Sequence, residues 1–280
     1  MANRSARERR FEAEALEEAL DVLERHRASL PEFSPEPDRS RWRAVLQETA
    51  TRLLDNYPYH HPLYVGQMLK PPHPVARLAY ALAMTINPNN HALDGGRASS
   101  AMEREAIEAL ARLFRLETHL GHLCGGGTMA NFEALWVGRQ ERPGLAIAAS
   151  EQAHYTHPRL SAVLGVPFRP LRADRSGRLD PSALERALEE GGIGTVVATL
   201  GTTAMGAVDP LPEILEICRP RGVRVHADAA YGGYFTLARN LPPAARRAFD
   251  RLREADSIVI DPHKHGLQPY GCGAVLFRDP

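Results

Sequence analysis

An aspartate and a lysine stand at the ends of two apolar runs in the second half of the chain. Asp228 closes the run VRVHAD, and Lys264 follows the run SIVID. A buried carboxylate is costly unless a cation or several donors meet it. A lysine amine can form an imine with a carbonyl compound, which an arginine cannot do. Taken singly, each residue also has an ordinary interpretation: Asp228 as a helix N-cap or an acceptor of backbone amides, Lys264 as a surface lysine.

Lysine is rare in this chain, which sharpens the question of what Lys264 does. Of 34 Lys and Arg residues only Lys70 and Lys264 are lysine. Lys70 precedes two prolines in a polar turn, so we interpret it as a surface residue. Lys264 lies between two histidines at the end of an apolar run, where arginine would have served a purely structural role equally well.

A glycine-rich stretch and a histidine follow two earlier apolar runs. The segment LCGGGTMANFEALW places three glycines and Thr128 before a predicted helix. Such a segment can bind a phosphate through its backbone amides, the threonine hydroxyl and the helix N-terminus, and we call it a phosphate cradle. A glycine turn before a helix is common, however, so this signal alone is weak. His154 follows LAIAAS, and its flat ring could stack on a heteroaromatic ring. The chain contains 12 histidines, so a loop histidine is the plain alternative.

The four features together match the needs of pyridoxal 5'-phosphate (PLP). Its phosphate, ring face, ring nitrogen and aldehyde carbon each find one partner. The sequence therefore predicts PLP as the cofactor and Lys264 as the Schiff-base lysine.

Hydrophobic periodicity predicts where these residues lie in the fold. From about residue 116, short apolar runs alternate with helical patterns, which is typical of an α/β fold with a mostly parallel sheet covered on both faces. Ligands of such sheets bind at the carboxyl ends of the strands, where the residues above fall. The predicted strands are 119–124, 145–150, 166–171, 195–201, 223–228, 257–261 and 274–279. The predicted helices are 5–30, 40–55, 74–84, 100–115, 129–139, 156–164, 181–190 and 210–219.

Composition excludes several classes of protein. Hydrophobic residues make up 44% and charged residues 24%, and the formal net charge is zero. We therefore expect no nucleic-acid or membrane partner. The charged N-terminus predicts no secretory signal, and no apolar run is long enough to span a membrane. Three widely spaced cysteines form neither a metal-binding pattern nor a disulfide framework, so we expect no metal and a cytoplasmic location.

The quoted motifs resemble the group II PLP-dependent amino-acid decarboxylases of the aspartate-aminotransferase-like fold. The matching segments are HPLYVGQM, NPNN, GGGTMAN, SEQAHYTHPRLSAVLG, ATLGTTAMGAVDPL, VHADAAYGG and DPHKHGLQPYGCGAVLFRD. The resemblance implies catalytic roles for Lys264, Asp228 and His154, with Asp228 paired to the pyridinium nitrogen. It further implies that His154 and Ala230 cover the two faces of the cofactor ring. The phosphate would be held by Gly127, Thr128 and His263. Thr202 would lie near the phenolic oxygen, and Tyr64 would line the substrate pocket. We expect His157, on the helix after His154, to tolerate alanine.

The resemblance implies decarboxylation of an L-amino acid by a homodimer. His265 stands where the family often has Trp, so the identity of the substrate is not predicted. A PLP-dependent C–C lyase similar to sphingosine-phosphate lyase is the alternative activity. We expect a three-layer, seven-stranded PLP-binding large domain at 101–280 behind a helical segment at 1–100. Family members continue with a small domain after the last strand. We therefore expect this chain to be a PLP-binding fragment, or one half of a split enzyme whose partner supplies the C-terminal domain, and to be poorly active alone.

Overall fold

A computed structural model describes residues 5–30, 39–59, 61 and 63–280. The chain divides into two compact units, Met1–Pro88 and Asn89–Pro280, which are described separately. The predicted division after residue 100 falls within helix α4 (Arg97–Leu113). That domain assignment stays a prediction. The predicted break of the helical pattern at PEFSPEPDRS lies almost entirely outside the described residues.

The first unit is helical. It contains α1 (Ala6–Arg27), α2 (Trp42–Leu53) and α3 (Pro74–Ile86). Helix α1 begins with a capping box, in which the Ser5 hydroxyl accepts from the Glu8 amide and the Glu8 carboxylate accepts from the Ser5 amide. An ion pair of 2.6 Å between Arg77 and Glu12 joins α3 to α1.

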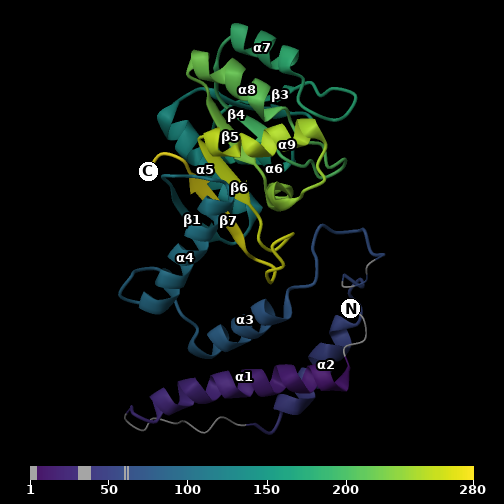
Figure 1. The fold of residues 1–280 in the computed structure, drawn as a ribbon, viewed down its shortest axis with the longest axis vertical. Helices are drawn as coiled ribbons and strands as arrows, with labels where there is room; N and C mark the ends of the chain where they lie inside the picture. Colours follow the sequence, from purple (N-terminus) through teal and green to yellow (C-terminus); the bar gives the residue numbers. More distant parts are fainter. Residues whose placement is uncertain (1–4, 31–38, 60, 62) are drawn as a thin grey trace. The chain divides into compact units, whose positions relative to one another are not determined.

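The second unit is built on a seven-stranded sheet (Figure 1). Its strands are β1 (Leu120–Cys124), β2 (Ala146–Ser150), β3 (Phe168–Leu171), β4 (Ile193–Thr199), β5 (Arg224–Asp228), β6 (Ser257–Ile260) and β7 (Gly273–Phe277), in the order β1-β7-β6-β5-β4-β2-β3. Among these strands β7 alone runs antiparallel to its two neighbours. The mostly parallel sheet predicted from the apolar runs is confirmed, and six strands end at the same edge.

Helices cover both faces of the sheet. Helices α5 (Gly127–Glu141) and α6 (Thr156–Leu164) pack on one face, and α4, α7 (Pro181–Glu189), α8 (Leu211–Cys218) and α9 (Pro243–Asp250) pack on the other. Short 3-10 helices occupy Arg219–Arg221, Gly233–Leu237 and Leu252–Glu254. Helix α9 was not predicted, because it is short and begins at the second of two consecutive prolines, yet it buries Ala248 and Phe249 in the core.

Alternation along the central strand β5 directs its polar side chains to one face. On β5, Val225 and Ala227 join the core under α8, whereas His226 and Asp228 point toward α5 and α6. This period of two is what a pleated strand imposes. The face under α5 and α6 therefore carries the buried polar side chains of β5, and Asp228 lies at the carboxyl edge.

None of the helices in the described parts of the chain is long and apolar enough to cross a membrane.

Candidate functional site

Asp228 is a buried carboxylate held from two sides. Its residue is 5% exposed. Its Oδ2 lies 2.9 Å from His157 Nε2, and its Oδ1 accepts from the Ala230 amide at 3.1 Å. Burial alone would raise the pKa of Asp228, but the hydrogen bond from His157 and the charges of His157, His226 and Lys264 outweigh it and hold the pKa below its usual range. The carboxylate is thus ionised, as a partner for a protonated ring nitrogen must be.

His157 corrects one prediction. It does lie on the helix after His154, as expected, but its side chain is fully buried and bonded to Asp228. Removal of a buried group that satisfies a carboxylate is costly, so His157 is not a position that tolerates alanine. The sequence signal was its spacing of three residues from His154, which places His157 in the first turn of α6.

Lys264 lies at the same edge, one strand further along the sheet. Its Nζ forms an ion pair of 2.8 Å with Asp261 Oδ2. Asp261 is 2% exposed, and its Oδ1 has no hydrogen-bond partner among the described residues. Burial raises the pKa of Asp261, while Lys264 and His263 act to lower it. Asp261 stands in the quoted DPHK segment but received no role from the sequence.

His154 stands between the charged groups of the site. It is half-buried, and its Nδ1 accepts from the Thr156 amide at 3.2 Å. Burial lowers its pKa, as do the charges of Lys264 and His157, whereas Asp228 and Asp261 raise it. His154 follows β2, Asp228 ends β5 and Lys264 follows β6, so the three residues lie at the same carboxyl edge of the sheet.

The glycine stretch begins α5 in the way the cradle hypothesis requires. Gly126 is the N-cap residue at φ 138°, a conformation that other residues rarely adopt. No side chain among the described residues caps this helix end, which leaves its first amides for an anion. Gly127 and Thr128 form the first turn, with Thr128 exposed. A Cβ at Gly127 would lie 2.6 Å from Asp261 Oδ2, so only glycine fits there.

His263 packs against this loop. Its ring is buried, its Cε1 would lie 3.2 Å from a Cβ at Gly126, and its Nδ1 accepts from the Cys272 amide at 3.2 Å. Burial lowers its pKa, although Asp261 acts in the opposite direction. With Nδ1 accepting, Nε2 is the nitrogen that can donate to a phosphate.

The remaining predicted residues are placed less decisively. Thr202 is buried, and its hydroxyl accepts from the Ala207 amide at 3.0 Å. Ala230 is buried beside Asp228. Tyr64 belongs to the first unit, where its ring contacts those of Tyr57 and Tyr59. Its role in a substrate pocket therefore stays a prediction.

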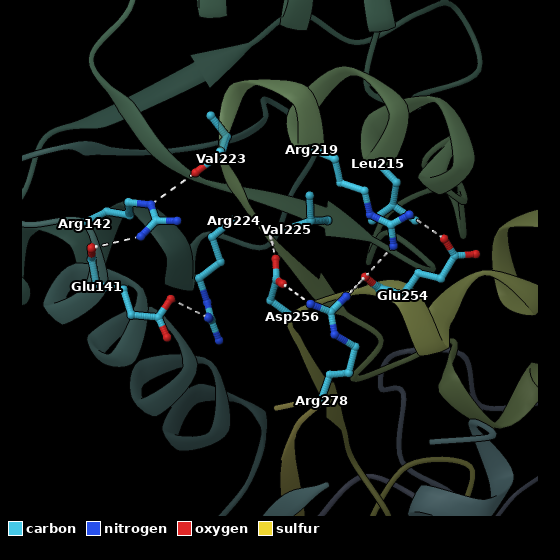
Figure 2. A pocket seen from close by; sticks show the side chains of 11 residues that line it. Glu141, Arg142, Leu215, Arg219, Val223, Arg224, Val225, Glu254, Asp256 and Arg278 are labelled. Carbon is cyan, nitrogen blue, oxygen red and sulfur yellow. Dashed lines mark hydrogen bonds and ion pairs between the residues drawn. The ribbon is translucent and has the colours of Figure 1, made fainter. Parts of the chain in front are cut away.

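A cavity lies at the opposite end of these strands. It has a volume of about 180 Å³, and Figure 2 shows arginines around it, each turned toward a carboxylate or a backbone carbonyl. Arg224 pairs with Glu141 at 2.7 Å, and Arg278 pairs with Asp256 at 3.0 Å. These ion pairs join the amino ends of β5 and β6 to the end of α5 and the end of β7. The cavity is therefore best explained as a structural charge network, in contrast to the carboxyl edge.

The residues at the carboxyl edge fit PLP. The residues comprise one amine, one buried ionised carboxylate, a flat ring and a helix N-terminus that follows a glycine turn and has no side-chain cap. These groups match an aldehyde, a pyridinium, a ring face and a phosphate respectively. By contrast, the described residues contain no group of three or more His, Cys, Asp or Glu side chains that could hold a metal ion.

Comparison with known proteins agrees with this fit. The model of the pyridoxal-dependent decarboxylase conserved domain matches residues 140–280, which include His154, Asp228 and Lys264. The chain is 32% identical over 220 residues to a probable L-tyrosine/L-aspartate decarboxylase of Methanothermobacter thermautotrophicus, covering 77% of this chain and 59% of that protein. It is 31% identical over 239 residues to cysteine sulfinic acid decarboxylase of Rattus norvegicus, covering 78% of this chain and 48% of the relative.

A solved structure shows the same fold. The crystal structure of mouse CSAD in its apo form superposes with a TM-score of 0.79 at 28% identity, covering 93% of this chain and 57% of that one. The chain thus spans about half the length of the relatives it matches. The family model, the relatives and the geometry of the site agree, and the chain belongs to the pyridoxal-dependent decarboxylase family.

Proposed function

We propose that this chain is the cofactor-binding part of an enzyme that decarboxylates an L-amino acid. The observation that supports the proposal is the position of Lys264, Asp228 and His154 at the carboxyl ends of β6, β5 and β2 of one sheet. An amine, an ionised buried carboxylate and a flat ring in one place are the protein groups that PLP chemistry requires.

Each residue has one task in this proposal. Lys264 attaches the cofactor covalently, and Asp228 holds a proton at the ring nitrogen. His154 stacks on one ring face and orients the substrate carboxylate, while Ala230 packs on the other face. The first turn of α5 at Gly127 and Thr128 binds the phosphate. In addition, His263 donates to the phosphate and Thr202 lies near the phenolic oxygen.

Bound PLP supplies an electron sink for the bond that breaks at the substrate Cα. The protein decides which bond this is by fixing the substrate's orientation, because the cofactor-binding residues are the same for decarboxylation and C–C cleavage. Relatives named as decarboxylases of aspartate, tyrosine and cysteine sulfinic acid favour decarboxylation. These three amino acids are the substrates to test first.

We also propose that the protein acts as a homodimer in the cytoplasm. Exposed apolar side chains on and next to α2, among them Leu46 and Leu54, support an association surface. The cytoplasmic location is supported by the three free cysteines, which are typical of a reducing compartment.

Reductive labelling tests the cofactor assignment. Protein supplied with PLP should show a visible absorption band, and borohydride should fix the cofactor on Lys264, as peptide mass mapping would reveal. The chain provides its own control, because Lys70 is its only other lysine. We expect Lys264→Ala to lose the band and the label and Lys70→Ala to keep both. Retention of the band in Lys264→Ala would overturn the assignment. Release of CO₂ from the three amino acids tests the reaction itself.

A further inference from the structure

The pair formed by His157 and Asp228 links the sheet to helix α6. The two side chains are 0% and 6% exposed, and they meet at 2.9 Å between Nε2 and Oδ2. The other carboxylate oxygen accepts from the Ala230 amide. Both oxygens of the carboxylate therefore accept hydrogen bonds from protein groups, and these bonds fix the plane of the carboxylate before any ligand binds.

The hydrogen on this contact belongs to the imidazole. An ionised carboxylate has no hydrogen to give, so Nε2 donates and Asp228 accepts. The other ring nitrogen, Nδ1, has no hydrogen-bond partner among the described residues. His157 therefore makes one directed side-chain contact in the described structure, and that contact is to Asp228.

The first turns of α6 hold the backbone of His157 in place beside the site. The His157 amide donates to the His154 carbonyl at 3.1 Å, and the Ser161 hydroxyl donates to the His157 carbonyl at 2.9 Å. One turn of backbone thus positions two histidines with different surroundings, since His154 is half-buried and His157 lies behind the carboxylate.

We propose that His157 is a positioning residue that acts through Asp228 on the ring nitrogen of the cofactor. The inference rests on the proposed function, because it takes PLP as the ligand of Asp228. The electrostatics agree with it: burial would raise the pKa of Asp228, and the largest opposing influence is the hydrogen bond from His157. Without that donor, the carboxylate would have only the Ala230 amide and would be less able to pair with a pyridinium.

A pair of ligands that differ only at the ring nitrogen isolates this effect. We would measure the dissociation constants of PLP and of 1-deazapyridoxal 5'-phosphate, which has carbon in place of that nitrogen. Wild-type protein should prefer PLP, and Asp228→Asn should abolish most of the preference. His157→Leu should reduce the preference by about tenfold or more, the usual range for a hydrogen bond to a charged group. His157→Gln, which can place an amide donor near Nε2, should restore much of it.

Leu160→Ala is the matched control, since Leu160 is buried on the same helix and packs in the apolar core. It should lower stability and leave the preference unchanged. If His157→Leu weakens both ligands equally, the role of His157 is structural and the inference is wrong. If His157→Leu does not fold, ¹⁵N-histidine spectra of wild-type protein decide: the Nε2 signal of His157 should shift with PLP and much less with the deaza analogue. Equal shifts would overturn the inference. Wild-type protein that does not attach PLP at Lys264 would instead overturn the proposed function.

Discussion

His154, just before α6, and His157, in the first turn of α6, differ in what surrounds them, and their surroundings predict different roles. His154 is half-buried at the mouth of the site, whereas His157 is enclosed and donates to Asp228. In the proposed site the cofactor's phosphate binds elsewhere, at the start of α5. His154 should therefore contribute more to orientation of the substrate than to retention of the cofactor.

His154→Ala tests this separation. Loss of an aromatic contact is worth about 0.5–1.5 kcal/mol, so the PLP dissociation constant should rise by no more than about tenfold. The rate of CO₂ release should fall by a larger factor, because the substrate carboxylate loses its partner. Absorbance titration and a CO₂ assay give the two numbers. Equal losses in binding and rate would contradict the stacking and orienting role.

Helix α5 is anchored to the sheet at its first turn by a chain of polar contacts. Asn131 Nδ2 donates to the Gly127 carbonyl at 2.8 Å, so its Oδ1 accepts from His226 Nε2, also at 2.8 Å. His226 must then carry its hydrogen on Nε2, and its Nδ1 accepts from the Ser257 hydroxyl at 2.9 Å. Burial lowers the pKa of His226 to about 3, in agreement with a neutral ring. The phosphate cradle is thus tied to β5 and β6.

Asn131→Leu tests the anchor. The substitution leaves the buried Nε2–H of His226 without an acceptor, which costs about 1–3 kcal/mol. We expect the free energy of unfolding in urea to fall by that amount and the PLP affinity to fall with it. Arg139→Ala, at an exposed position on the same helix, should change stability by less than about 0.5 kcal/mol. A fully stable Asn131→Leu protein would show that the contact chain is dispensable.

The whole domain combines buried groups whose titrations oppose one another. Asp209 is buried, accepts from the Leu179 and Thr199 amides, and has its pKa raised to about 6 by burial. The stability that it contributes is present at low pH and is lost as the pH rises through 6. His226 behaves in the opposite way. Its folded pKa lies below the unfolded value of about 6.5, so its contribution is present above that value and is lost as the pH falls.

His226→Gln separates the two effects, because glutamine keeps a donor but does not titrate. Between pH 6.5 and pH 5 the proton excess of the unfolded wild-type chain over the folded chain at this residue rises from about one half to nearly one. One bound proton changes the free energy of unfolding by about 1.4 kcal/mol per pH unit. Urea unfolding at both values should therefore show wild type losing about 1.7 kcal/mol relative to the variant. A difference that does not change with pH would mean that His226 is not a buried neutral ring.

The sequence by itself determined the alternation of strands and helices and the cofactor. It also predicts which residues would bind that cofactor and in what order. Those signals are local: apolar runs of strand length, a glycine turn before a helix, and single residues that close strands. Helix α6 was predicted with the bounds 156–164 that the structure shows. Asp228 and Lys264 were identified because a charged side chain at a buried strand end is costly unless it has a partner or a function.

Only the tertiary structure decided which groups serve those residues. The bonds from His157 to Asp228 and from Lys264 to Asp261 join side chains on different elements or across a turn. Such pairings depend on helix rotation and strand register, which periodicity does not specify to the accuracy of a hydrogen bond. The identity of residue 157 as histidine does not reveal whether its side chain faces water or a carboxylate. Packing of α6 on the sheet made it the partner of Asp228.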